Sequence, residues 1–595
     1  MKFQDVIATG LFIISAMIFG REIKLWSKAK ISGSLLEGII PGMALMGIVF
    51  HVFGAIGVLH QGTLLVLPSA LLLRQVVSAY MEGNCSNRLR TTKLNLHKPL
   101  SNWPVYAFGV IILEPIFTLS IRKQDAYDAL AYQMYAPLRA LFQTHSFNAN
   151  ELVANAGLPV GAGSLHGWLV AFGLNPFTGV ATSVFALLLI FVIVNSEDRP
   201  LINLMKISAA FGIIFALGGS VFGSVNSDLA MVPFVVYVIR QIATESSQKI
   251  NLQSVVVLGF IPLIKPFAII FCLALMVSIG WNKGKGKYQI LKLCSAVSIP
   301  YMIWCLKNFY QVQNPFYPMF QKYFGGPGYG AEIMTLESDV RRSFTQFADV
   351  MHHMIVNPID TLNKFGNWLI LPFLVTALMI NFVANRKGHE NFESKFAIWF
   401  SIITGVIIAG PVGRYALYGL VVLTLYGVLA YEITTKDRFL SRNRRVIVTV
   451  STMVLVTVPI IIGLPNFVKA LMISKNDLQT DVDIENVQIA ASEVIPKESS
   501  ICVIGDNRAL LFYPNLVFAF ESNRKNPFSN VYSKSVTEIT SELKLFGCDF
   551  VIVHWGWGFP QNINVGDLKA WSINQKSDGN QIYNTQNWQI FRLDD

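Results

Sequence analysis

Long apolar runs separated by short polar segments constrain this chain more than any other feature of its sequence. A helix of about 20 predominantly apolar residues crosses the hydrocarbon core of a bilayer. Charged residues make up only 14% of the 595 residues, whereas a soluble domain carries about 25%, so the sequence predicts a polytopic, all-α membrane protein. We expect about 11 to 14 spanning helices, at residues 4–20, 35–57, 61–80, 104–121, 176–195, 200–222, 229–243, 253–264, 266–282, 289–306, 366–384, 396–411, 414–432 and 446–464.

Short basic segments indicate how these helices are oriented. The net charge of +11 is concentrated in loops between apolar runs, which is the pattern of the positive-inside rule rather than of a nucleic-acid-binding surface. All of these loops can face the cytoplasm with consistent alternation: REIKLWSKAK at 21–30, NRLRTTKLNLHK at 87–98, KGKGK at 283–287, NRKG at 385–388 and TTKDRFLSRNRR at 434–445. Three larger pieces then lie outside the cytoplasm: 122–175, 307–365 and the chain after about residue 466.

Two apolar segments need separate treatment. The stretch LPVGAGSLHGWLVAF at 158–172 does not fit this alternation as a full crossing, so we expect it to be partly embedded at the outer surface. The first apolar run lacks a small-residue cleavage site and is followed by cations, which indicates a membrane anchor rather than a cleaved signal peptide.

The C-terminal part has a different composition. SSICVIG, NLVFAFES and CDFVIVHW are typical of short buried strands, and SVTEITSELKLFG predicts a helix that ends at Gly547. We therefore expect a small extracytoplasmic α/β domain within 466–595. None of the six cysteines forms a CxxC pair, which leaves a metal or redox motif unsupported. For Cys502 and Cys548 we favour buried free thiols, with a disulfide as the alternative.

A dense polar cluster, RKQDAYDALAYQMYAPLRAL at 122–141, follows an apolar run. A helix through 124–136 would place Asp125, Asp128, Tyr132 and Tyr135 near one face, with Pro137 interrupting the helix and Arg139 after it. Carboxylates near a bilayer are costly unless they face water or a partner. From the spacing alone, a solvated interfacial helix with a tyrosine belt and a functional cluster both remain open.

The segment DALAYQMYAPLRAL resembles the first outer loop of bacterial GT-C-type glycosyltransferases, the superfamily of protein mannosyltransferases and aminoarabinose transferases. That loop has the pattern W-D-x-L-x-Y-H-L-P, and Asp128, Leu130, Tyr132 and Pro137 match it. The family's histidine is Gln133 here, and one extra residue precedes the proline.

Further segments resemble the same family in the same order. SDLAMVPFVVYVIR and LGFIPLIKPFAII resemble two of its helices, LKNFYQVQNPFYPMFQKYFG at 306–325 resembles a later outer loop, and GRYALYGLVVLTLYG at 413–427 resembles its Arg-Tyr helix. The resemblance covers roughly 104–465, so it implies three parts: extra N-terminal helices in 1–100, a catalytic core in 101–465 and the C-terminal domain in 466–595.

The resemblance implies an inverting enzyme of the bacterial inner membrane that takes a sugar from a polyprenyl-phosphate carrier. Asp128 would act as general base on the acceptor hydroxyl, with Asp125 as the alternative. Arg414, Tyr415, Lys265 and Arg139 would bind the donor phosphate, and Tyr132, Asn314, Tyr317 and His166 the substrates. No metal is required, although the two aspartates could bind a divalent ion. The expected partners are this donor, a glycan, lipid or protein acceptor, and membrane lipids, with no nucleic acid.

Structural explanations compete with these roles. NPFYP could be an extended turn because proline restricts itself and its predecessor. Lys265 could be a snorkelling interface anchor, Arg414 an ordinary loop cation, and His166 a packed histidine. Two other functions also remain open, an O-antigen polymerase or ligase and a transporter or flippase of lipid-linked glycans. Transporters commonly contain paired halves with broken helices, a pattern that we do not find in this sequence.

Overall fold

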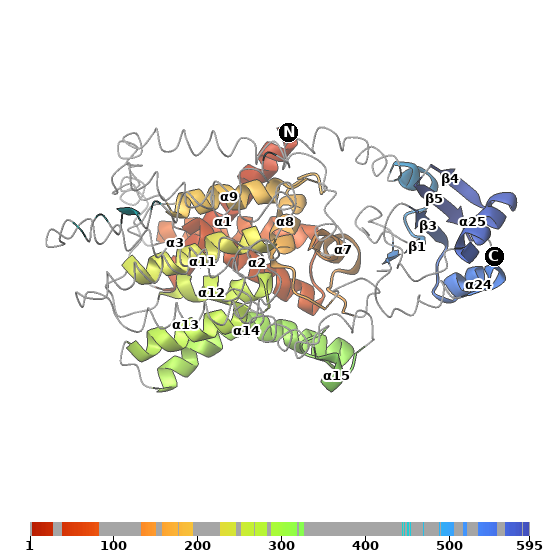
Figure 1. Ribbon diagram of the computed structural model, residues 1–595. Coiled ribbons are helices and arrows are strands. Elements are labelled where there is room, and N and C mark those ends of the chain that lie inside the picture. Colours follow the sequence, from red (N-terminus) through yellow and green to blue (C-terminus); the bar gives the residue numbers. More distant parts are fainter. Residues whose placement is uncertain are drawn as a thin grey trace.

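The computed structural model shows a group of packed helices and a C-terminal sheet domain (Figure 1). It describes residues 3–27, 38–81, 133–149, 157–176, 178–193, 227–244, 251–266, 268–282, 287–317, 320–326, 487, 489–504, 516–519, 534–555, 566–585 and 587–593, with a few single positions between 443 and 468. The predicted spans at 104–121, 200–222, 366–384, 396–411 and 414–432 lie outside these residues, as does most of 446–464.

The remaining predicted apolar runs all form helices. They are α1 (Phe3–Trp26), α2 (Ile39–Ile56), α3 (Gln61–Met81), α9 (Val180–Ile193), α11 (Ser227–Thr244), α12 (Leu252–Ile264), α13 (Ala268–Asn282) and α14 (Lys287–Val312), followed by the short α15 (Gln321–Phe324). Three stretches of the described chain are long and apolar enough to cross a membrane: Phe3–Trp26, Ile39–Ile56 and Ile290–Val312. These helices are compatible with membrane association, and the larger number of crossings remains a prediction.

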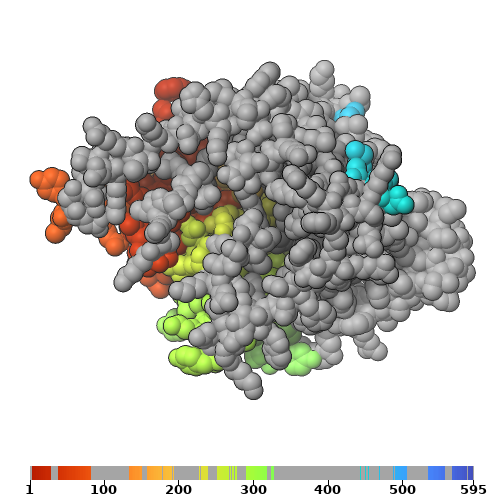
Figure 2. Space-filling model, turned by 90° about the vertical axis from the view of Figure 1, so that its left-hand side faces the viewer, coloured from red at the N-terminus to blue at the C-terminus, as the bar shows by residue number. Residues whose placement is uncertain are grey.

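Glycines let several of these helices approach one another closely. A Cβ atom at Gly42 of α2 would overlap the carbonyl oxygen of Ala16 in α1, and one at Gly47 would overlap the ring of Phe260 in α12. Small residues at such contacts are typical of helix packing in membranes, where association depends on close van der Waals contact. Figure 2 shows the result on one face, where red and orange N-terminal helices lie beside yellow-green and green helices from much later in the sequence.

Helix α8 (Gly161–Ala171) occupies the segment that we expected to be partly embedded at the outer surface. All 11 of its residues are buried, and it contacts α1, α2, α3, α7 (Tyr135–Arg139), α9, α11 and α12. At 1.5 Å per residue it is about 16 Å long, too short to cross a bilayer of about 30 Å. It is therefore an internal helix of the bundle, held in part by a hydrogen bond from the Trp168 indole to the carbonyl of Met46 (3.0 Å).

The C-terminal domain is a five-stranded mixed sheet with helices. Its strands are β1 (Ser500–Ile504), β2 (Leu516–Ala519), β3 (Phe550–His554), β4 (Gln581–Asn584) and β5 (Trp588–Arg592), in the order β2-β1-β3-β5-β4. The pairs β2-β1 and β1-β3 are parallel, and β3-β5 and β5-β4 are antiparallel. The first three strands and α24 (Val536–Leu545) confirm the prediction, whereas α25 (Gly566–Ser577), β4 and β5 are additions to it.

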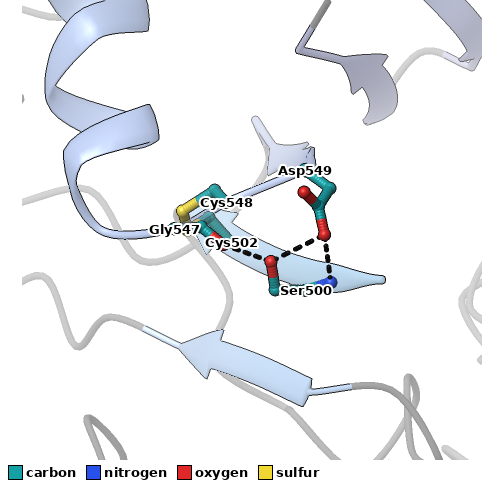
Figure 3. The surroundings of a disulfide bond; sticks show 5 residues. All are labelled: Ser500, Cys502, Gly547, Cys548 and Asp549. Carbon is teal, nitrogen blue, oxygen red and sulfur yellow. Dashed lines mark hydrogen bonds between the residues drawn. A yellow bond between two sulfur atoms is a disulfide. The ribbon is translucent and has the colours of Figure 1, made fainter. Parts of the chain in front are cut away.

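The expectation of free thiols in this domain was wrong, because Cys502 and Cys548 form a disulfide (Figure 3). Their Cα atoms lie 5.7 Å apart, within the usual range for a disulfide. The parallel register of β1 and β3 pairs Ile501 with Phe550 and so brings Cys548, two residues before Phe550, beside β1. The backbone N–H of Ser500 donates to the Asp549 carboxylate (2.7 Å) and holds the same end of the two strands together.

Candidate functional site

The predicted site residues fall into two groups. Five of them, Asp125, Asp128, Tyr132, Arg414 and Tyr415, lie outside the described residues, and their roles remain predictions. The other five are described, and each is considered below: Arg139, His166, Lys265, Asn314 and Tyr317.

The C-terminal end of α14 binds the first predicted outer loop. Trp304, Asn308 and Gln311 share one face of the helix because they follow the spacing i, i+4, i+7. The Trp304 indole and the Asn308 amide both donate to the carbonyl of Gly157, at 2.9 and 2.8 Å. Gln311 accepts from the backbone N–H of Ala149 and donates to the carbonyl of Phe147, both at 2.9 Å. Two separate points of the loop are thus fixed to a single helix.

The same helix end also fixes the second predicted outer loop. Asn308 donates to the carbonyl of Tyr317 (3.3 Å) as well as to that of Gly157. The buried Tyr317 lies against Gly157, where a Cβ atom would overlap the tyrosine ring. Segments that are about 160 residues apart in the sequence therefore meet at Asn308, which agrees with their predicted placement on one side of the membrane.

Asn314 gives the NPFYP segment its local shape. Its side-chain oxygen accepts from the N–H of Phe316 (3.0 Å), and its amide donates to the carbonyl of Gly325 (3.1 Å). The preceding Gln313 has a left-handed backbone with φ of 59°. These features are those of a structured turn, and the substrate-binding roles of Asn314 and Tyr317 remain predictions.

Arg139 lies in a helix that runs through Pro137. Helix α7 (Tyr135–Arg139) continues directly into a π-helical segment, Ala140–Thr144, so the expectation that Pro137 interrupts the helix was wrong. Gln133 and Met134, directly before α7, are also helical, so helical structure lies on both sides of Pro137. The buried Arg139 guanidinium donates to the hydroxyl of Tyr135, one turn earlier, and lies 5.6 Å from the centre of that ring.

The first turn of α8 lies beside the elements that carry the two described phosphate-binding candidates. A Cβ atom at Gly163 would contact Gln133 and Pro137, just before Arg139. A Cβ atom at Gly161 would lie 2.8 Å from the backbone nitrogen of Ile264, the residue before Lys265. Lys265 itself caps the C-terminal end of α12 in an extended conformation. Arg139 and Lys265 therefore follow segments that pack against the same short helix.

His51 is a buried residue that sequence reasoning missed. Its Nδ1–H donates to the carbonyl of Gly47 (2.8 Å), and its Nε2 accepts from the N–H of Val160 (3.3 Å), just before α8. These partners select the neutral Nδ1–H tautomer. Its ring lies 5.3 Å from that of Trp304. An apolar helix with one histidine gives no signal of this arrangement, because both partners are backbone groups.

Lys307 is a second residue that the sequence analysis did not single out. Its side chain is buried, and its Nζ lies 4.0 Å from the centre of the Trp304 ring, a distance suited to a cation–π interaction. The only feature of the sequence that could have drawn attention to Lys307 is its place in the LKN segment, at the C-terminal end of α14. It adds a cation to the helix end that fixes both loops.

His166 has the surroundings of a packed histidine. It is fully buried in α8, and its Nε2 lies 2.9 Å from the carbonyl oxygen of Pro176, in the turn that follows the helix. The competing structural explanation accounts for this geometry, and a substrate-binding role remains a prediction.

The described residues contain no candidate metal site, and comparison of the sequence with known proteins gives no family. No group of three metal-ligating side chains occurs among them, and Asp125 and Asp128 lie elsewhere in the chain. No known protein family and no curated protein matches this chain significantly.

Proposed function

We propose that this protein is a GT-C-type glycosyltransferase that moves a sugar from a polyprenyl-phosphate carrier to an acceptor outside the cytoplasm. The proposal rests on the ordered sequence resemblance. The observation in the structure that supports it most directly is the C-terminal end of α14, where Asn308 binds both Gly157 and Tyr317. These residues belong to the two loops that resemble the family's outer loops.

The proposed chemistry requires a base and fixed cations. Asp128 would take the proton of the acceptor hydroxyl while its oxygen attacks the anomeric carbon from the face opposite the phosphate. The departing polyprenyl phosphate gains negative charge, which Arg414, Lys265 and Arg139 would stabilise. Arginine suits this role because its guanidinium can bind two phosphate oxygens at once.

The disulfide in the C-terminal domain supports the proposed orientation. Disulfides such as Cys502–Cys548 persist in oxidising compartments and are rare in the cytosol. A C-terminal domain outside the cytoplasm places the segments 122–175 and 307–365 on the same side, according to the alternation of the apolar runs. A reporter that is active only in the cytoplasm, fused after Asp595, should therefore be silent.

Replacement of the aspartates tests the proposed reaction. Asp128→Asn keeps the shape of the side chain but cannot accept a proton, so release of free polyprenyl phosphate should fall about 100- to 10,000-fold. Asp125→Asn should have a smaller effect. The two purified variants are compared with the unmodified protein at equal amounts of folded protein, over a panel of polyprenyl-phosphate sugars.

The results separate the competing assignments. If Asp125→Asn abolishes release and Asp128→Asn does not, the roles of the two aspartates are exchanged. If neither variant changes release, the loop is an interfacial helix and the proposal fails. Transport of a lipid-linked glycan without release of polyprenyl phosphate would instead identify a flippase. Mass analysis of envelope glycans with and without the protein would identify the sugar and distinguish transfer from polymerisation.

A further inference from the structure

A charge pair whose acidic partner is buried joins α1 to α3. Glu22 of α1 has a fully buried side chain, and both of its carboxylate oxygens have partners on α3. Arg74 donates to one oxygen (2.9 Å) and Gln75 to the other (3.0 Å), while Gln75 also donates to the carbonyl of Ile18 (3.0 Å). Ionisable groups among membrane helices are costly and mark functional positions, so this pair requires an explanation beyond helix packing.

The pair uses only some of the hydrogen-bond donors of Arg74. Its side chain remains 56% exposed while Glu22 is 0% exposed. A guanidinium carries five N–H donors in a planar fork, and Glu22 accepts from one nitrogen, Nη1. The rest of the fork faces the surface of the molecule, where a second anionic group can reach it.

The surface around Arg74 is apolar. Leu73 and Val77 of α3 are 65% and 45% exposed, and Val66 is 64% exposed two turns earlier. An exposed apolar stripe on α1, at Ile7, Leu11 and Ile14, leads to the exposed cation Arg21 one further i+7 step along the helix. Parts of both helices lie on the outer surface in Figure 2, in red and orange. Each helix thus presents an apolar face that carries a cation: Arg21 follows the stripe on α1, and Arg74 lies between Leu73 and Val77 on α3.

The position of the cations along the helices matches a membrane interface. Arg21 lies five residues before the end of α1, and Arg74 seven residues before the end of α3, which corresponds to about 8 and 10 Å. The exposed aromatic residues Trp26 and Tyr80 lie near the same two helix ends, as expected of an interfacial aromatic belt. Segment 21–30 includes the end of α1, and segment 87–98 follows α3. Each contains four Lys or Arg residues.

We propose that α1 and α3 form a binding site for an anionic phospholipid, with Arg74 and Arg21 binding its phosphate and the two apolar faces contacting its acyl chains. A phosphate would complete the hydrogen bonding of the Arg74 guanidinium in a bidentate arrangement. Glu22 orients Arg74 from the buried side and leaves the outer side of the fork for the lipid. The surplus of cations at this end favours an anionic over a zwitterionic headgroup.

Native mass spectrometry of the full-length, delipidated protein tests this site. The protein is supplied with phosphatidylglycerol or phosphatidylcholine of identical acyl chains, and the retained lipid is counted. We expect preferential retention of phosphatidylglycerol. The double variant Glu22→Gln/Arg74→Gln removes both charges together, so it avoids leaving a buried carboxylate unpaired, and it should weaken retention of phosphatidylglycerol about tenfold. Arg21→Gln should weaken it less.

Lys292→Gln is the matched control, because Lys292 is an exposed cation near the start of α14 and should leave retention unchanged. Equal retention of the two lipids by the unmodified protein would overturn the site. So would unchanged selectivity in the double variant, or an equal loss with Lys292→Gln. A dimer that buries α1 and α3 and excludes lipid would also overturn it. None of these outcomes depends on glycosyl transfer.

Discussion

Glycines of the helical region have a task that the glycines described in the C-terminal domain lack. In the helices, Gly20, Gly42 and Gly163 lie where another backbone approaches so closely that a Cβ atom would overlap it. In the C-terminal domain, Gly547 and Gly579 have φ values of 78° and 80° just after helices, and a Cβ atom at either would meet nothing within 4 Å. Glycine therefore ends helices in both regions, since Gly57 caps α2 with a φ of 78°, and in the helical region it also sets the distance between helices.

The two regions accordingly depend on different interactions. The helical region combines backbone contact at glycines with hydrogen bonds from buried side chains to distant carbonyls, such as those of Trp304 and Gln75. The C-terminal domain combines a sheet core, capped helices and a covalent link. A change in one region should therefore affect that region first, and region-resolved hydrogen exchange can test this expectation.

Removal of the disulfide should have the largest effect on stability. Cys502 and Cys548 are buried and close a loop with a sequence separation of 46, for which the chain-entropy model gives about 4 kcal/mol. The double variant Cys502→Ala/Cys548→Ala should exchange much faster throughout β1, β3 and α24. Peptides from α1, α2 and α8 should be unchanged.

Cys294→Ala is the control for this variant, because Cys294 is a half-buried free thiol in α14. It should leave the C-terminal domain unaffected. If the helices lose protection together with the sheet, the two regions unfold as one unit and the comparison does not hold.

Gly42→Ala should have the next largest effect, in the opposite region. Its Cβ atom would overlap the Ala16 carbonyl and lie 2.8 Å from the backbone nitrogen of Gly20. Backbone atoms cannot rotate away as a side chain can, so we expect a loss near the upper end for overpacking, about 3 kcal/mol. Thermal unfolding of the detergent-purified protein measures this loss. The control Gly62→Ala, in α3, meets nothing within 4 Å and should be neutral or slightly stabilising.

The C-terminal domain was easier to predict from sequence than the helical region for a physical reason. Helix α24 is specified locally, by Ser535 and Glu538 at its start and by Gly547 after its end, and β1 and β3 are short, continuous apolar runs. The disulfide was missed because it depends on the register of β1 against β3, which no local pattern specifies. Helix α25 was missed because its residues are largely polar, and strands β4 and β5 were missed because each is short and mixes polar with apolar residues.

In the helical region the sequence predicts where apolar helices form but not which of them touch. The burial of α8 depends on seven neighbouring helices, which no local pattern identifies. Its apolar composition alone fits a position at the membrane surface equally well. For the candidate site, the resemblance drew attention to Asn314 and Tyr317. Trp304, Asn308 and Gln311 contact backbone carbonyls, and the only sign of this in the sequence is that the three residues have a helical spacing. Such partners cannot be inferred because every residue has a carbonyl group.

Asn308→Ala tests whether a single side chain holds the two loops together. The change removes the donor to Gly157 and Tyr317 and should cost about 2 kcal/mol, since buried carbonyls lose a partner. Hydrogen exchange should increase around 157–160 and 314–317 while the C-terminal domain is unchanged. Tyr310→Ala is the control, because Tyr310 is 86% exposed on the same helix. Unchanged exchange at both loops would show that the remaining contacts suffice.

The smallest expected effect concerns pH and the start of α24. Glu538 accepts hydrogen bonds from the Ser535 hydroxyl (2.8 Å) and backbone N–H (3.1 Å), and these bonds hold the pKa of its carboxyl below the usual value. Because the pKa is lower in the folded state, the contribution of Glu538 to stability is present above the unfolded-state pKa and is lost as the pH falls through the folded-state pKa.

Glu538→Gln should therefore reduce the acid-dependent part of exchange in α24, because an amide can still accept the same hydrogen bonds but does not titrate in this range. Exchange of α24 peptides, corrected for the intrinsic effect of pH on amide exchange, is compared between neutral and mildly acidic buffer. The matched variant Glu542→Gln, one turn later in the same helix, keeps the carboxylate at the helix start and should retain the acid dependence of the unmodified protein. Equal acid dependence in all three proteins would mean that α24 is stabilised by its packing against α25 and the sheet rather than by its first turn. The contrast between a C-terminal domain specified by local sequence and a helical region specified by distant contacts would then be weaker.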